Sequence, residues 1–278
     1  MSLKHKKRRK KRRIWLFLFL LVALLTLDSN LRIATTEYTV AVEDLPEDFR
    51  GFRIAQLSDL HGAEFGEGND RLVSAVKAAA PDIIALTGDF VAKEADLAVA
   101  VSLARELVHI APVYFVSGNH DFASGHFNAL TAALEETGVR CLRNEAVTLQ
   151  RENGSLILAG VDDPNGPFDM LKPDEVVDII NANHPDKPLV LLAHRNDFIE
   201  KYPYLQVDII ICGHAHGGVV RLPFLGGLLG TGFELFPEYT EGVHESGSYS
   251  LVISRGLGNS AGLIRFGNNP ELAVITLE

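Results

Sequence analysis

Hydrophobic residues recur along this chain in two patterns, short continuous runs and longer helical stripes. The short runs are rich in Val, Ile and Leu and end at polar residues or glycine, which is typical of buried strands. We expect strands at 37–42, 52–58, 82–87, 112–117, 155–161, 188–193, 207–212, 248–254 and 271–277. The helical stripes predict helices at about 69–80, 94–110, 126–138 and 173–183. The chain is therefore expected to have an α/β fold.

Strands and helices alternate in the first half of this pattern, whereas the later strands have less helix between them. Such an order predicts two packed sheets flanked by helices within one domain, which we place at residues 37–278. Residues 28–36 are expected to form a short linker that precedes this domain.

The N-terminus combines a basic tail with an apolar segment. Residues 1–13 hold nine Lys and Arg residues and no acidic residue, and the apolar stretch 14–27 follows at once. This stretch is shorter than the about 20 residues that span a bilayer. We expect residues 14–33 to act as an uncleaved signal-anchor, with Trp15 at one interface; a cleaved signal peptide is the alternative. Because the cations should stay cytoplasmic, we expect a single-pass cell-membrane protein whose main domain is extracytoplasmic.

Charge and cysteine content exclude two further classes of protein. The net charge is −10, but outside the basic tail the chain has 17 basic and 36 acidic residues. Such an acidic body is not expected to bind nucleic acid, and an anionic substrate would have to be attracted locally by metal ions. The two cysteines, Cys141 and Cys212, are too few for a disulfide framework.

Five polar motifs follow the ends of expected strands. They are Asp59-Leu60-His61, Gly88-Asp89, Gly118-Asn119-His120-Asp121, Ala193-His194 and Gly213-His214-Ala215-His216. Loops at the carboxyl ends of strands converge on one rim of a sheet, which is where α/β proteins place ligands. Each residue taken singly has an ordinary structural explanation, but the five motifs together predict one functional site.

The side chains of these motifs are suited to binding metal. Carboxylates, imidazoles and a carboxamide favour divalent ions such as Mn, Fe, Zn or Co over Mg. Asp59 and His61 are alternate residues, so an extended backbone would direct both at one ion. Two ions about 3.5–4 Å apart bind a phosphoryl group and lower the pKa of a bridging water towards about 7. His120, followed by Asp121, fits the acid that protonates a leaving group.

With these motifs the sequence resembles the calcineurin-like metallophosphoesterases over roughly residues 37–278. The resemblance implies a four-layer α/β fold with a central β-sandwich, two divalent metal ions, and attack by a metal-bridging hydroxide. It implies that His120 contacts the phosphate and protonates the leaving group, with Asp121 orienting it. The first metal would be held by Asp59, His61, Asp89 and His216. The bridging Asp89 would share the second metal with Asn119, His194 and His214.

Segments 44–46, 57–62, 216–218 and 254–259 are similar to a bacterial membrane-associated branch of that family. This branch includes phosphodiesterases and enzymes that resemble UDP-2,3-diacylglucosamine pyrophosphatase. The chain departs from it at Val219, where Gln is frequent, and at Asn196, where Pro is common. The expected targets are phosphodiester or pyrophosphate bonds of lipid-linked molecules. The alternatives are a broad phosphomonoesterase or nucleotide phosphodiesterase, and a non-catalytic, metal-stabilised binding protein.

The stretch 217–240 is apolar, rich in glycine, and directly follows His216. We expect either an apolar lid that faces the membrane and contacts a lipid chain, or a loop packed on the sandwich. Arg221 and Arg255 are candidate contacts for a phosphate or a head group.

Overall fold

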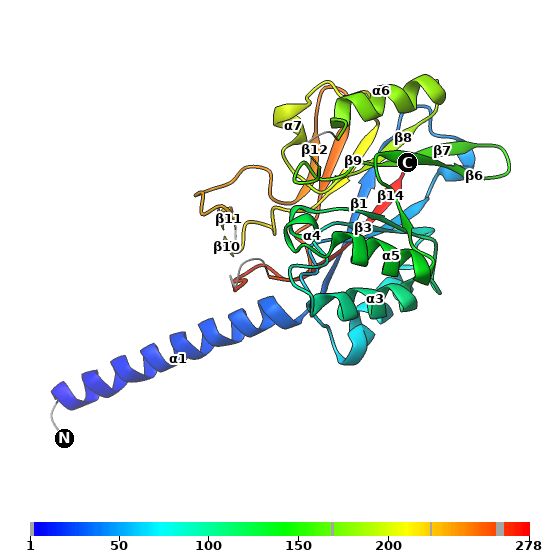
Figure 1. Cartoon of the computed structure of the whole chain (residues 1–278). Helices are drawn as coiled ribbons and strands as arrows, with labels where there is room; N and C mark the ends of the chain where they lie inside the picture. The colour runs from blue at the N-terminus through cyan, green and yellow to red at the C-terminus, as the bar shows by residue number, and fades with distance from the viewer. Residues whose placement is uncertain (1–2, 168–169, 223, 260–263) are drawn as a thin grey trace.

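The computed structural model describes residues 3–167, 170–222, 224–259 and 264–278 (Figure 1). The first of its two large sheets contains six strands. In spatial order these are β1 (Ala34–Val40), β14 (Glu271–Leu277), β2 (Arg53–Leu57), β3 (Ile83–Thr87), β4 (Val113–Val116) and β5 (Arg140–Cys141). Only the β14–β2 pair is antiparallel, so β2, β3 and β4 run in the same direction. Their carboxyl ends therefore lie at one edge of the sheet.

The second large sheet is also mixed and has six strands. In spatial order these are β12 (Gly242–Glu245), β13 (Ser250–Ile253), β9 (Ile209–Cys212), β8 (Leu189–Leu192), β7 (Ser155–Gly160) and β6 (Glu145–Gln150). The outer pairs β12–β13 and β6–β7 are antiparallel, and the four central strands are parallel. A separate two-stranded hairpin consists of β10 (Val220–Leu222) and β11 (Gly226–Leu229).

Three hydrophobic clusters divide the molecule into four layers. The first cluster joins one face of the first sheet to α2 (Asp70–Ala79), α3 (Asp96–Leu107) and α5 (Phe127–Thr137). The second lies between the two sheets, and the third joins the second sheet to α6 (Pro173–Asn183) and α7 (Phe198–Lys201). Helices therefore cover both outer faces of a β-sandwich, which confirms the fold expected from the sequence.

The nine expected strands correspond to β1, β2, β3, β4, β7, β8, β9, β13 and β14. The strands β5, β6, β10, β11 and β12 were not predicted, because they are short or only partly buried and lack a continuous apolar run. The short helices η1 (Glu47–Phe49), η2 (Glu67–Asn69), α4 (Asn119–Ala123) and α7 were also missed. The expected linker at 28–36 is wrong, because a helix continues to residue 31 and β1 begins at residue 34.

The N-terminal helix α1 (Leu3–Leu31) projects from the body (Figure 1). Its segment Lys10–Leu31 is 22 residues long, apolar and almost entirely exposed. At 1.5 Å per residue this segment spans about 33 Å, against about 30 Å for the hydrocarbon core of a bilayer. By length and composition it fits a membrane anchor or a signal sequence.

Candidate metal centre

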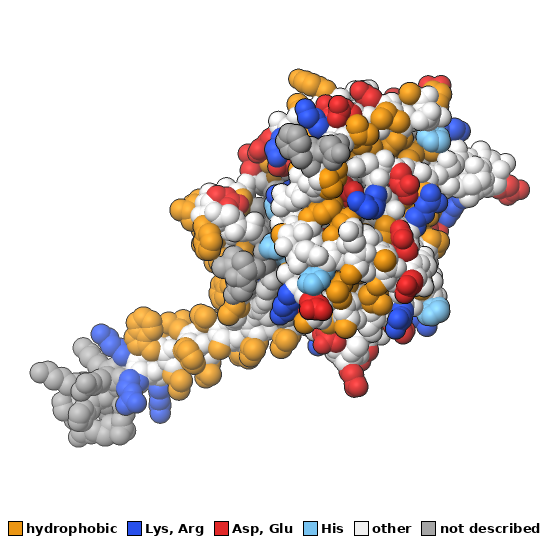
Figure 2. Space-filling view, in the orientation of Figure 1, with side chains coloured by type: hydrophobic (Ala, Val, Ile, Leu, Met, Phe, Trp, Pro, Cys, Tyr) orange, Lys and Arg blue, Asp and Glu red, His pale blue; other side chains and the backbone are white. Residues whose placement is uncertain are grey.

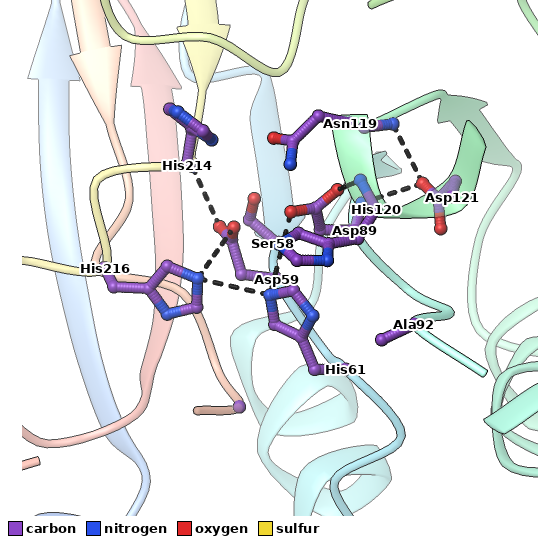
Figure 3. A network of polar contacts seen from close by, with 12 residues as sticks. Ser58, Asp59, His61, Asp89, Ala92, Asn119, His120, Asp121, His214 and His216 are labelled. Carbon is purple, nitrogen blue, oxygen red and sulfur yellow. Dashed lines mark hydrogen bonds and ion pairs between the residues drawn. The ribbon is translucent and has the colours of Figure 1, made fainter. Parts of the chain in front are cut away.

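The five sequence motifs lie together at one rim of the sandwich (Figure 3). The first sheet contributes Asp59 after β2, Asp89 after β3 and Asn119 after β4. The second sheet contributes His194 after β8 and His214 after β9. Both sheets of the sandwich therefore supply side chains to one site, as the positions of the motifs predict.

A first donor cluster consists of Asp59, His61 and His216. The Nε2 atoms of the two histidines lie 3.2 Å apart, and His216 Nε2 lies 3.2 Å from Asp59 Oδ1. Asp59 and His61 share this cluster, but the expected reason is wrong, because their backbone is not extended. Their φ angles are 54° and 45°, so two left-handed turns aim both side chains at one point.

A second donor cluster consists of Asp89, His194 and His214. His194 Nε2 lies 3.2 Å from both Asp89 Oδ2 and His214 Nδ1. It also lies 3.1 Å from Asn119 Oδ1, which adds a fourth donor. The other ring nitrogen, His194 Nδ1, lies 2.9 Å from the carbonyl oxygen of Thr87. In a neutral His194 ring, a donor N–H at Nδ1 would leave Nε2 free to bind a cation in the cluster.

Asp89 lies between the two clusters. Its Oδ2 atom lies 3.2 Å from His194 Nε2 in the second cluster and 3.7 Å from His61 Nε2 in the first. Its Oδ1 atom accepts the backbone N–H of His120 at 2.7 Å. One carboxylate thus faces both clusters, which is the position of a bridging ligand.

The donor set fits two divalent cations. Ligand atoms about 2.0–2.2 Å from one ion lie about 3.0–3.4 Å from each other, and the close donor contacts within the two clusters are 3.1–3.2 Å. Asp59 Oδ1 is buried and receives no hydrogen bond from the described residues. A cation placed between these groups would stabilise them, because it attracts both the lone pairs of the facing imidazole nitrogens and the buried carboxylate oxygen that lacks a hydrogen-bond donor.

Five of the seven expected metal ligands have left-handed backbone. The φ angles are 54° at Asp59, 45° at His61, 57° at Asp89, 67° at His214 and 48° at His216. Residues with a Cβ rarely adopt this conformation, which costs of order 1–3 kcal/mol at each position. Strained turns therefore recur at the donors, where the surrounding sandwich holds the loops that follow the strands.

Gly88 and Gly118 allow the loops after β3 and β4 to touch. A Cβ atom at Gly118 would lie 2.2 Å from Asp89 Oδ1. A Cβ atom at Gly88, where φ is 84°, would lie 2.7 Å from the Cα of Gly118. A side chain at Gly118 would displace the carboxylate that faces both clusters, and one at Gly88 would push the two loops apart, which explains the glycine in both motifs.

His120 and Asp121 lie in the first turn of α4. The ring of His120 packs edge-on against that of His61, with ring centroids 4.9 Å apart. Among the described residues, no hydrogen bond joins the Asp121 carboxylate to the His120 ring. That carboxylate instead accepts four backbone N–H groups at 2.8–2.9 Å, those of Asp89, Phe90, Val91 and Gly118. Asp121 therefore ties the loop after β3 to the loop after β4.

His194 balances much of the buried negative charge among the protein groups. Burial alone would lower its pKa, but the carboxylates of Asp89 and Asp59 raise this pKa to about 10. Burial, together with His194 and Arg195, lowers the pKa of His214 to about 4. The two histidines of one cluster therefore differ in charge at neutral pH, because burial and the neighbouring positive charges outweigh the carboxylates at His214 but not at His194.

The side chains of three residues outside the expected set contact the candidate ligands. Arg265 Nη2 lies 3.2 Å from His216 Nδ1, and Asn268 Nδ2 donates to the His216 carbonyl oxygen at 2.7 Å. Arg195 Nη1 lies 3.3 Å from His214 Nε2. Arg195 follows directly after His194, which is a usable signal. No spacing in the sequence connects residues 265 and 268 with the histidine motif.

The two arginines expected to contact a phosphate are already paired with carboxylates. Arg221 forms an ion pair with Glu241. Arg255 lies 3.0 Å from Glu271 and 3.3 Å from Glu241. Their charges are neutralised within the fold, so the structure does not support the expected role.

The stretch 217–240 is divided between packed and exposed residues. Val219 is 4% exposed, as a loop packed on the sandwich requires. That interpretation is wrong for the larger apolar side chains of this stretch, because Phe224, Leu225, Phe233, Leu235 and Phe236 are all exposed.

Comparisons with known proteins agree with this site. The sequence model of the calcineurin-like phosphoesterase family matches residues 52–218, more than half of the chain. Metallophosphoesterase YkuE of Bacillus subtilis is 29% identical over 88% of this chain and 86% of its own length. Phosphodiesterase YaeI of Escherichia coli is 28% identical over 81% of this chain and 82% of its own length.

Among solved structures, the sulfate thiohydrolase SoxB of Thermus thermophilus has a TM-score of 0.51 and 15% identity. The match covers 84% of this chain and 57% of SoxB, and it shows a shared fold. The fold, the two donor clusters and the family match lead to one conclusion: the chain belongs to the calcineurin-like phosphoesterase family and is a metal-dependent phosphoesterase.

Proposed function

We propose that this protein is a membrane-anchored phosphoesterase that hydrolyses phosphodiester or pyrophosphate bonds of lipid-linked molecules. The main observation behind this proposal is that two donor clusters lie next to each other on either side of Asp89, with His120 beside them. Two neighbouring cations supply Lewis acidity and an activated water to such a reaction. The named activity of the Escherichia coli relative, a phosphodiesterase, supports a diester as substrate.

Each residue has a defined task in this proposal. One ion would be held by Asp59, His61, Asp89 and His216, and the other by Asp89, Asn119, His194 and His214. The two carboxylates offset part of the charge of the cations. Asp121 keeps the loop of Asp89 against the loop of Asn119 through its four backbone hydrogen bonds.

His120 is the proposed general acid. Its backbone N–H is held by Asp89 Oδ1, which fixes the first turn of α4 at the site. Its ring lies at the border of the first cluster, edge-on to His61, and remains partly exposed. A side chain at the open border of the donors reaches the leaving oxygen of a substrate and delivers the proton there.

The proposed placement at the membrane rests on α1. Its exposed apolar segment is long enough to cross a bilayer, and nine basic residues lie within residues 1–13, ahead of the apolar stretch 14–27. Basic residues beside a span stay on the cytoplasmic side. The metal centre would then act outside the cytoplasm, close to the outer surface of the membrane.

The test uses the full chain in detergent micelles, loaded in turn with Mn, Fe, Zn and Co. Turnover is compared on bis(p-nitrophenyl) phosphate, p-nitrophenyl phosphate and a UDP-linked diacyl lipid, with chelated enzyme and His214→Ala as controls. We expect chelator-sensitive turnover of the diester or the UDP-linked lipid. Preference for the monoester would replace this proposal with a phosphomonoesterase, and two bound metals without turnover would indicate a binding protein.

A further inference from the structure

Large exposed apolar side chains gather on the segment that follows the metal ligand His216. We name residues 219–222 and 224–236 the hairpin lobe, since they contain β10, β11 and the loop after them. Phe224 is fully exposed and Phe233 is 69% exposed. Figure 2 shows this lobe as a projection with hydrophobic side chains on its surface. Apolar side chains clustered on a soluble surface mark a contact with a partner or a membrane.

The hairpin lobe and α1 project from the same side of the body (Figures 1 and 2). A short C-terminal segment, residues 264–269, connects them. Asn30 Nδ2 of α1 donates to the Arg265 carbonyl oxygen at 2.8 Å, and Gly267 N donates to Ser29 Oγ at 2.9 Å. In the lobe, Arg221 N donates to the carbonyl oxygen of Phe266 at 2.8 Å. The helix and the lobe are therefore held in a defined relative position.

The exposed apolar surface continues across this connection. Ile264, the first residue of the connecting segment, is 63% exposed. The last turns of α1 expose Leu24, Leu25, Leu27 and Leu31. Three separate stretches of chain thus present exposed apolar side chains around the base of α1. A site for one short peptide would need only a single groove, so this spread of apolar side chains favours a membrane over a peptide.

Charge distinguishes the hairpin lobe from the rest of the body. Its described residues include one basic and one acidic residue, Arg221 and Glu234, and Arg221 is paired with Glu241. Outside the basic tail the chain has 36 acidic against 17 basic residues. An acidic surface is repelled by anionic lipid, whereas an uncharged surface with exposed Phe and Leu enters the interfacial region.

We propose that the hairpin lobe is a second membrane contact, which places its phenylalanine and leucine side chains in the outer leaflet beside α1. The inference rests on the proposed membrane anchor and adds a defined orientation to it. The lobe begins three residues after His216, so its insertion holds the metal centre at the level of the lipid head groups. A phosphoester of a membrane lipid would meet the site without leaving the bilayer.

The experiment places a single fluorescent label on the full, metal-loaded chain in vesicles of phosphatidylcholine and phosphatidylglycerol. Bimane is attached to Phe224→Cys or Phe236→Cys. Cys141 and Cys212 are buried and do not compete for the label. The matched control is Tyr204→Cys, which is 81% exposed beyond α7, and the positive control is Leu20→Cys within α1.

Quenching by lipids with a nitroxide on the acyl chain is compared with quenching by aqueous iodide. We expect nitroxide quenching at positions 224 and 236 at least twofold stronger than at 204, and iodide quenching at least twofold weaker. If the labels at 224 and 236 behave like the label at 204 while the label at 20 is quenched by lipid, the inference is overturned. The proposed membrane anchor would then still stand. Lipid quenching at none of the four positions would overturn both.

A label shielded from both lipid and iodide would also overturn the inference, because it would show that protein covers the lobe. Repeating the measurement at tenfold higher lipid-to-protein ratio identifies that protein. Shielding lost on dilution indicates a second copy of this chain.

Discussion

The guanidinium group of Arg265 lies behind the metal ligand candidate His216, with Nη2 3.2 Å from the imidazole Nδ1. Arg265 is 1% exposed, and Nη2 also donates to the carbonyl oxygens of Gly258 at 2.7 Å and Arg255 at 2.8 Å. Burial lowers the pKa of its guanidinium to about 10, so the group remains charged at neutral pH. One buried cation thus fixes the loop after β13 close behind the ring of a candidate ligand.

Replacing Arg265 should therefore weaken the first metal site more than the second. In Arg265→Gln the carbonyl groups at 255 and 258 lose a charged donor, and we expect the free energy of unfolding to fall by about 2–4 kcal/mol. Loss of a group that orients a ligand typically lowers metal affinity by about 10–100-fold. Urea unfolding and metal content by mass spectrometry measure both effects, with exposed Arg105→Gln as the control. Two fully occupied sites in a stably folded variant would show that Arg265 has no positioning role.

His120→Asn should retain both metals and lose turnover. General acids contribute about 10²–10⁴-fold to the rate, and we expect a loss of kcat in that range for esters with alkyl leaving groups. The loss should be smaller for p-nitrophenyl esters, since p-nitrophenolate leaves without a proton. Steady-state rates on both ester types, with His126→Asn as the matched control, separate these cases. An equal loss on both types would assign His120 to phosphate binding instead of acid catalysis.

Asp121→Asn should release both metals although the residue is not a ligand. Asparagine has the shape of aspartate, but its NH₂ group replaces one of the two carboxylate oxygens. The backbone N–H groups that donate to that oxygen would then face another donor. We expect a stability loss of about 2–4 kcal/mol and less than one metal per chain. Thermal unfolding and metal analysis test this, with exposed Asp178→Asn as the reference. Normal metal content would refute the role of Asp121 in holding the loops.

Metal binding should release protons and strengthen as the pH rises. Without metal, the Asp89 and Asp59 carboxylates raise the pKa of His194 to about 10, so this ring is protonated at neutral pH. A ligand must be neutral, and each displaced proton makes the apparent affinity rise about tenfold per pH unit below that pKa. The raised pKa of His194 also adds to the free energy of unfolding of the apo-protein. This contribution is fully present below pH 6.5, the ordinary pKa of histidine, and it is lost as the pH rises through about 10.

Titration calorimetry in two buffers of different ionisation enthalpy counts the released protons. We expect at least one proton per metal pair at pH 7.5, with tighter binding at pH 8.5 than at pH 6.5. His61 should add none, because burial and His216 lower its pKa to about 3. Equal affinity across this pH range without proton release would contradict a protonated His194.

The central strands could be predicted because their signal is local. β2, β3, β8 and β9 are buried along almost their whole length, and burial on both faces produces continuous Val, Ile and Leu runs in the sequence. A polar motif directly after such a run must lie at the edge of the sheet where that strand ends. The fold, the candidate metal centre and its seven candidate ligands could be predicted from this information.

Other features depend on partners that are distant in the chain. His214 and His216 are two residues apart, yet the left-handed turns at both positions direct them into different clusters. Arg265 lies 49 residues beyond His216 and reaches its ring only because β14 pairs between β1 and β2. Arg221 has a suitable residue type for phosphate, but Glu241 already neutralises it.

From the sequence alone we could predict the candidate metal ligands and the succession of strands along the chain, because hydrophobic burial and ligand chemistry depend on residue type and near neighbours. The three-dimensional contacts were needed to see how the candidate donors group into two clusters, which residues support them from behind, and that the phenylalanines of the hairpin lobe are exposed beside α1. These properties depend on backbone turns and on contacts between distant segments, and neither leaves a periodic pattern in the chain.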